Sequence, residues 1–146
     1  MKGLVVVILL SLAVAGTGCV RQLRHDPALA ASSAQKFVEL LAVKGDVNGA
    51  YEMTDPASRH GRSAADLGKS VSSVPIGKLD DVAATEFQPV PGQPAIDIFL
   101  KGHNTDGKTI HFAVRVNGTA DDGYAPASMA VAFEPFPASS MRRSLQ

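Results

Sequence analysis

Residues 95–117 carry the pattern that most constrains the fold, because apolar and polar side chains alternate on both sides of a short turn. The stretch reads AIDIFLKGHNTDGKTIHFAVRVN. A three-residue loop at 105–107 that ends in glycine is typical of a type I turn followed by a bulge. The pattern therefore predicts an antiparallel hairpin in which Ile98 faces Val114 on an apolar face.

The same register sorts the polar side chains of the hairpin. Asp97 then faces Arg115, and Lys101 faces His111, all on the opposite face. A two-residue loop would instead pair Lys101 with Ile110, and such a slip by one residue mixes the two faces. The sequence thus predicts a sheet with one apolar and one polar side.

Four strands are expected, at about 78–88, 94–103, 108–117 and 126–135. The prolines of the QPVPGQP segment exclude it from the first ladder, because proline lacks a backbone N–H. The residues expected on the apolar face are Ile96, Ile98, Leu100, Gly102, Ile110, Phe112, Val114, Val116, Met129, Val131 and Phe133.

Helix signals precede the strands. Asp26 followed by Pro27 is a typical helix start, and it predicts a helix up to Lys44 that Gly45 ends in a left-handed conformation. The side chains at helical spacing are Leu29, Ser33, Phe37, Leu40 and Leu41.

Three shorter helical segments are expected next. Asp46 can cap a short helix, and Asp55 before Pro56 predicts about one turn. The sequence from Ser63 to Asp66 resembles a capping box and opens a last helix that ends before Val74. Helices followed by a one-sided sheet predict an α+β domain in which the N-terminal helices pack on one face of a curved antiparallel four-stranded sheet.

The N-terminus is organised differently. A positive end, an apolar stretch of about a dozen residues and small residues up to position 18 predict a cleaved signal peptide at 1–18. The stretch is too short for a transmembrane helix, which needs roughly 20 apolar residues. The sequence GTGC at 16–19 resembles the lipobox of bacterial lipoproteins, although Gly16 stands where that family usually has leucine.

The lipobox resemblance implies that Cys19 is acylated and anchors the protein in the bacterial cell envelope. The residue after Cys19 is not aspartate, which implies the outer membrane, facing the periplasm. Residues 19–26 would form a tether, 27–136 a single domain and 137–146 a flexible tail. A secreted protein with a free cysteine is the alternative.

Charge argues against a nucleic-acid partner. Without the leader, which contains Lys2, the chain has 13 Lys+Arg and 14 Asp+Glu, and no run of like charges exceeds two residues. A nucleic-acid binder needs a basic stripe or patch.

The segment AQKFVELLAVKGDVNGAYEMTDPASR, together with the order of elements over about 28–136, resembles small bacterial lipoproteins of the nuclear transport factor 2-like superfamily. Cystatin-like proteins share the plan of a helix on a curved sheet. The resemblance implies a cone-shaped domain. Enzymes of the superfamily place an Asp, His or Tyr inside the cone, and many members bind partners or dimerise through the sheet.

Catalytic chemistry is not evident in the expected cone. Its apolar face contains no ionisable residue, and the polar residues of the strands fall on the other side: Asp97, Lys101, His103, His111, Arg115 and Glu134. Tyr51 and Asp55 are the only polar candidates for a pocket, whose expected members are Tyr51, Ile98, Leu100, Phe112 and Val114. The spacing of the four histidines predicts no metal site, and no cofactor is expected.

The outer face of the sheet is mixed, since Phe99 lies there among alanines such as Ala113 and Ala130. This face is a candidate surface for a protein partner or a homodimer, and its expected members are Phe99, Asp97, His111 and Arg115.

Three functions compete at this point. The first is a lipid-anchored, non-catalytic envelope protein that binds a protein partner or a small apolar ligand. The second is an immunity or inhibitor lipoprotein that acts against an envelope toxin. The third is an isomerase or lyase on the same fold.

Overall fold

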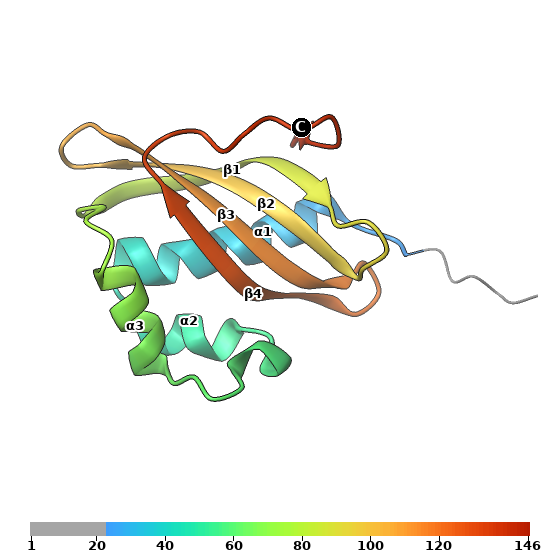
Figure 1. The fold of residues 1–146 in the computed structure, drawn as a ribbon, viewed down its shortest axis with the longest axis horizontal. Helices are drawn as coiled ribbons and strands as arrows, with labels where there is room; N and C mark the ends of the chain where they lie inside the picture. The colour runs from blue at the N-terminus through green and yellow to red at the C-terminus, as the bar shows by residue number, and fades with distance from the viewer. Residues whose placement is uncertain (1–22) are drawn as a thin grey trace, which may run out of the picture.

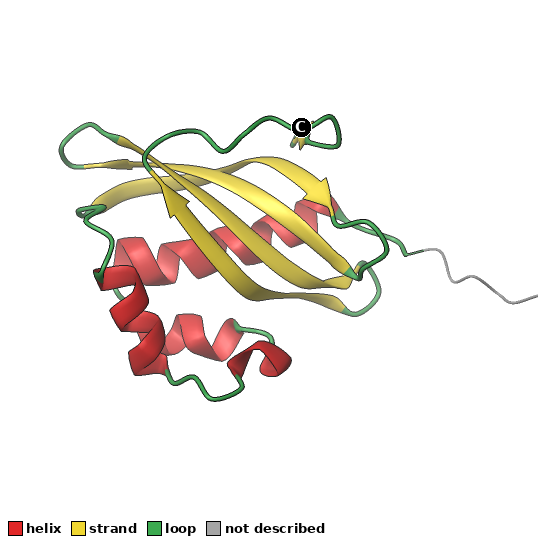
Figure 2. Cartoon of the chain, viewed as in Figure 1, coloured by secondary structure: helices red, strands yellow, loops and turns green. Residues whose placement is uncertain are grey.

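The computed structural model describes residues 23–146, which form an α+β fold with a helical layer on one face of an antiparallel sheet (Figures 1 and 2). The predicted leader, Cys19 and the first part of the tether lie outside the described residues. Among residues 23–146, no helix combines the length and apolarity needed to cross a membrane. The helical segments are α1 (Pro27–Val38), η1 (Glu39–Lys44), α2 (Val47–Met53), η2 (Pro56–Arg59) and α3 (Ala64–Ser72). The strands are β1 (Leu79–Pro89), β2 (Ala95–Asn104), β3 (Thr109–Thr119), β4 (Gly123–Ala132) and β5 (Arg143–Ser144).

The sheet has the order β4-β3-β2-β1-β5, and its central hairpin has the predicted register. Ile98 pairs with Val114, and Asp97 pairs with Arg115. The turn depends on Gly107, which has a φ of +76° that other residues rarely adopt. The alternation predicted from residues 95–117 is therefore confirmed.

Strands β1 and β4 depart from simple alternation, because each has a register shift against its neighbour. The register between β1 and β2 shifts twice, so the side chains of Leu79, Val82, Ala84 and Phe87 all pack on the core despite their irregular spacing. Strand β4 covers 123–132 rather than the predicted 126–135.

As a consequence, the prediction that Phe133 lies on the apolar face of the sheet is wrong. It lies after the end of β4, and its side chain is exposed.

The predicted helix starts are confirmed. Asp26 and Asp46 accept hydrogen bonds from backbone N–H groups three residues later, at 3.0 and 2.9 Å. Ser63 and Asp66 form the capping box of α3. The long helix ends at Gly45, as predicted, but its last part, η1, is a wider π-helix.

The buried side of α1 differs from the expected one. Leu29 is exposed, and the residues that face the sheet are Ala30, Ala31, Ala34, Phe37 and Val38. This face also has helical spacing, and its three alanines lack bulky side chains that would hold the helix away from the sheet. The hydrophobicity of Leu29 was therefore a misleading guide to the orientation of the helix.

The C-terminal segment is not the free tail expected at 137–146. It returns along the outer face of the sheet, where β5 pairs with Glu86 and Phe87 of β1. The guanidinium of Arg142 lies 3.7 Å from the centre of the Phe99 ring and donates to the carbonyl of Pro137 at 2.6 Å. These contacts fix the segment across the sheet.

Candidate functional site

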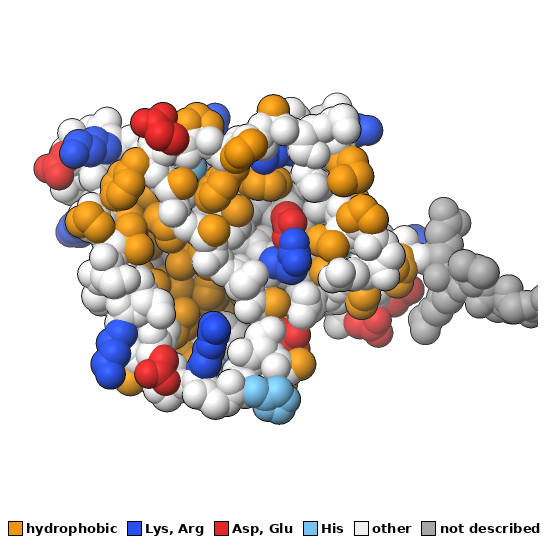
Figure 3. All heavy atoms as spheres, viewed as in Figure 1, with side chains coloured by type: hydrophobic (Ala, Val, Ile, Leu, Met, Phe, Trp, Pro, Cys, Tyr) orange, Lys and Arg blue, Asp and Glu red, His pale blue; other side chains and the backbone are white. Residues whose placement is uncertain are grey.

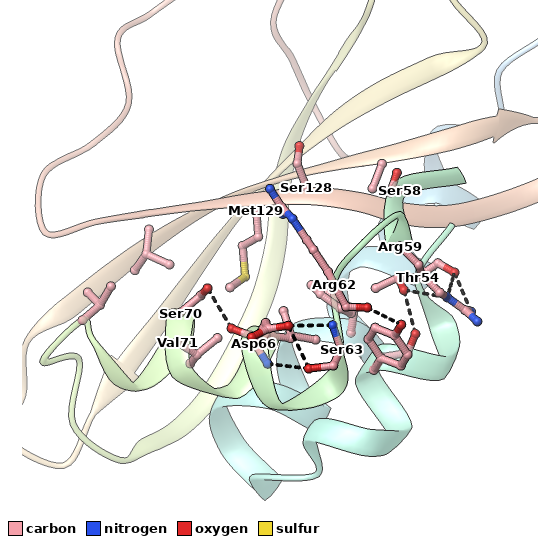
Figure 4. Close-up of a pocket in the computed structure, with 16 residues that line it drawn as sticks. Thr54, Ser58, Arg59, Arg62, Ser63, Asp66, Ser70, Val71, Ser128 and Met129 are labelled. Carbon is pink, nitrogen blue, oxygen red and sulfur yellow. Dashed lines mark hydrogen bonds between the residues drawn. The ribbon is translucent and has the colours of Figure 1, made fainter. Parts of the chain in front are cut away.

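A cavity of about 500 Å³ lies between β4 and the layer formed by α2, η2 and α3. Figure 3 shows hydrophobic side chains gathered in this hollow, with charged groups along its helical edge. Figure 4 shows the lining at close range. The lining residues are Phe37, Tyr51, Thr54, Ser58, Arg59, Arg62, Ser63, Asp66, Leu67, Ser70, Val71, Val74, Ala127, Ser128, Met129 and Val131.

The inner part of the cavity is apolar and comes from three elements. Phe37 lies on α1, Leu67 and Val71 on α3, and Met129 and Val131 on β4. The cavity volume is within the range of about 300–1,000 Å³ found for small-molecule sites, which are mostly lined by hydrophobic side chains.

The cavity is open because α3 does not pack closely against the sheet. Its main packing partners are α2 and η1, whereas α1 packs against β1, β2, β3 and β4. Helix α1 is bonded to the beginning of β4, where the hydroxyl of Ser33 donates to the carbonyl of Tyr124 at 3.0 Å. In the second half of β4, Met129 and Val131 line the hollow.

Arg59 and Tyr51 form a rigid part of the rim. The Arg59 guanidinium donates to the carbonyls of Glu52 and Thr54, both at 2.7 Å, and lies 5.2 Å from the centre of the Tyr51 ring. The Tyr51 hydroxyl donates to the carbonyl of Arg62 at 2.8 Å. These bonds tie the end of α2 to the loop before α3.

Arg62 differs from Arg59. Its side chain extends from the loop before α3 toward Ser128 on β4, across the mouth of the cavity (Figure 4). Within residues 23–146, the Arg62 guanidinium forms no hydrogen bond, and only the backbone of Arg62 is bonded, for example its carbonyl to the Tyr51 hydroxyl. The guanidinium is thus available to a ligand at the mouth.

Asp66 is the single carboxylate among the described lining residues, and it is already engaged. Its Oδ2 accepts from the backbone N–H and the hydroxyl of Ser63, both at 2.8 Å. These hydrogen bonds, first that from the backbone, lower the pKa of Asp66, and Lys69 and Arg62 lower it further. Asp66 is therefore an ionised helix cap.

The structure brings together only part of the expected pocket. Tyr51 lines the cavity, but Ile98 and Val114 are fully buried in the core. Leu100 and Phe112 are also core residues, and they adjoin a separate small cavity of about 80 Å³ under the C-terminal segment. The cavity lies one strand further out than expected, at β4.

Asp55, the other polar candidate, does not line this cavity. It caps η2 and accepts a hydrogen bond from the side-chain amide of Asn117 at 2.6 Å. Its carboxylate thus fastens the helical layer to β3.

The expected partner surface is largely used within the chain. Asp97 and Arg115 form two hydrogen bonds at 2.8 and 2.9 Å, which raise the pKa of Arg115. Phe99 lies under Arg142 and contacts Phe136, with the ring centres 6.0 Å apart.

His111, the fourth member of that surface, is buried. Burial lowers the pKa of its imidazole, and the charge of Lys101 lowers it further. Only part of the outer face expected for a partner therefore remains uncovered.

The titratable side chains that line the cavity are Tyr51, Arg59, Arg62 and Asp66. No histidine lines it, and its one carboxylate caps a helix. Across residues 23–146, no group of three His, Cys, Asp or Glu side chains could hold a metal ion.

Sequence reasoning missed Arg59, Arg62, Ser70 and Ser128 as cavity residues. Two arginines on either side of Gly61 were a visible signal, but their position opposite β4 depends on the packing of α3. A scan against protein-family models and searches of curated proteins and of solved structures found no match to this chain.

Proposed function

We propose that this protein is a non-catalytic binding protein of the bacterial cell envelope, anchored by lipid on Cys19, whose cavity takes up a small apolar ligand. The observation that carries the proposal is the hollow of about 500 Å³ with an apolar interior and no buried ionisable side chain in its lining. Burying apolar surface from water provides the binding energy, about 25 cal/mol for each Å² buried.

The arrangement also supports the resemblance to nuclear transport factor 2-like proteins. A helical layer covers one face of an antiparallel sheet, and the hollow lies where that cover ends. Cystatin-like proteins share part of this plan, so the family assignment remains our proposal. The outer-membrane location rests on the sequence around Cys19, and mass spectrometry of the processed N-terminus tests acylation there.

An isomerase or lyase has less support than a binding protein. Such enzymes need a general base beside the substrate, with its pKa tuned by burial. The carboxylate of Asp66 is exposed and bound to Ser63. An immunity or inhibitor role would use a protein-binding surface, and no feature of the described residues favours it over ligand binding.

The test is binding of a neutral, environment-sensitive dye such as N-phenyl-1-naphthylamine to the purified full chain carrying Cys19→Ala. Val71→Trp fills the cavity, whereas Lys69→Trp adds the same side chain to α3 outside the lining. All variants share the same leader, so the difference between them reports on the cavity.

We expect dye binding that Val71→Trp abolishes and Lys69→Trp preserves. Equal binding by the two tryptophan variants, or no dye binding at all, would show that the cavity is not a ligand site.

A further inference from the structure

We propose that the ligand is an anionic single-chain amphiphile, with its hydrocarbon chain in the cavity and its acidic head group bound by Arg62 at the mouth. This inference rests on the proposed function, because it names the class of ligand that the same cavity would take. It goes further by assigning the recognition of the head group to one side chain, Arg62.

The first argument is the distribution of polarity along the cavity. The residues deepest between the layers are apolar, among them Phe37, Val71 and Met129. The charged residues of the lining belong to η2, to the start of α3 and to the loop between them. A ligand that fits this gradient has one apolar end and one polar end.

The second argument is charge. The lining contains two arginines and one aspartate, whereas the whole chain has a formal net charge of zero. The carboxylate of Asp66 already accepts two hydrogen bonds from Ser63, and these bonds stabilise its ionised state. The mouth therefore carries an excess of positive charge, which favours an anion over a cation.

The third argument separates the two arginines. Arg59 has its Nε and one terminal nitrogen bonded to backbone carbonyls of α2 and of the residue after it. Arg62 has no such bonds among the described residues, and its side chain spans the mouth toward β4 (Figure 4). A planar guanidinium can donate two parallel hydrogen bonds to a carboxylate or a phosphate. Arg62 is thus the residue assigned to the head group.

The opposite wall of the mouth contributes apolar side chains. Met129 of β4 faces the cavity, whereas Ser128 pairs with Arg115 and its hydroxyl points away from α3, toward the outer face of the sheet (Figure 4). The head group would therefore be held from the helical side of the mouth.

The experiment measures displacement of the neutral dye from the full Cys19→Ala chain by three amphiphiles of equal chain length: decanoate, decanol and decyltrimethylammonium. We expect decanoate to bind about tenfold more tightly than decanol, a difference that one charge-assisted hydrogen bond can supply. Decyl phosphate, tested in parallel, distinguishes a preference for carboxylate from a preference for phosphate. The ammonium compound should bind most weakly.

Arg62→Gln should reduce the affinity for decanoate to that for decanol and leave decanol unchanged. Lys69→Gln removes one positive charge from α3 outside the cavity lining, and it should preserve the preference for decanoate.

The two proposals fail in different ways. If the dye and decanol bind in the cavity but decanoate shows no advantage, or if Arg62→Gln keeps that advantage, the head-group assignment is wrong and the proposed function stands. Tighter binding of the ammonium compound than of decanoate has the same meaning. If no probe binds in a manner sensitive to Val71→Trp, the proposed function itself fails.

Discussion

Two pairs of neighbouring residues on the same face of the sheet have opposite environments. Phe112 and Val114 on β3 are completely buried, whereas their partners on β4, Val131 and Met129, are only half-buried and line the cavity. All four are apolar, so the type of side chain does not explain the difference in burial. The difference follows from how closely a helix covers each strand.

Helix α1 covers the centre of the sheet closely, because the small side chains on its buried face allow it to pack near the strands. Ala30 and Ala34 have no exposed surface at all. Helix α3 packs instead on α2 and η1, and its residues facing β4 leave a space. An apolar strand thus becomes either buried core or the lining of a cavity, according to how closely a helix covers it.

The largest expected effect comes from truncating an apolar side chain at the centre of the sheet rather than at its edge. Ile98→Ala should lower the free energy of unfolding by about 2–5 kcal/mol, because Ile98 is fully buried and its loss leaves a void. Met129→Ala should cost about 1 kcal/mol, since its side chain already borders an open cavity. Urea denaturation of both variants measures the difference, and equal losses would contradict the distinction between closed and open regions.

An intermediate effect comes from adding volume under each helix. Ala34→Leu should destabilise the protein by about 1–3 kcal/mol, because no space remains between α1 and the sheet. Ser70→Leu on α3 points a similar side chain into the hollow, and it should change stability by less than about 0.5 kcal/mol.

The same two variants should also differ in their effect on dye binding. Ser70→Leu should weaken dye binding, while Ala34→Leu should affect binding only as far as it unfolds the protein. Thermal unfolding and dye titration on the same samples separate the two. A well-tolerated Ala34→Leu would mean that α1 does not seal the sheet as described.

The smallest expected effect concerns the start of α3. Ser63→Ala removes the cap and should cost about 1 kcal/mol or less. Because α3 packs mainly on α2 and η1, the loss should appear as faster hydrogen exchange in 64–72, with little change in α1.

Acid should act in the same direction as Ser63→Ala. The pKa of Asp66 is lower in the folded state, so the folded state binds fewer protons in the acid range and the contribution of this cap is present at neutral pH. This contribution to stability is lost as the pH falls below the ordinary pKa of an aspartate and then through the lowered pKa of Asp66. Asp66→Asn should remove this pH dependence from the exchange of α3, and an unchanged pH profile would argue against the capping role.

The parts of the fold that were predicted correctly depend on signals within a few residues. The turn at Gly107 sets the pairing of Ile98 with Val114, and Asp26, Asp46 and Ser63 start helices where their side chains can accept backbone hydrogen bonds. Such interactions are local, so they can be recognised without knowledge of the tertiary structure.

The errors arose where the outcome depended on distant segments. Leu29 is exposed because the alanine face of α1 fits the sheet more closely. Phe99 and His111 are covered because the C-terminal segment returns to pair with β1. No local pattern around residues 137–146 shows that Arg142 lies over Phe99.

By itself, the sequence determined the class of the fold, the register of the central hairpin and the apolar character of one sheet face, because alternation and turn chemistry act between near neighbours. Only the tertiary structure decided which part of that face is sealed and which part lines a cavity. The reason is that burial depends on the closeness of a covering helix, and that distance is set by packing among α1, α2 and α3 rather than by the strand itself.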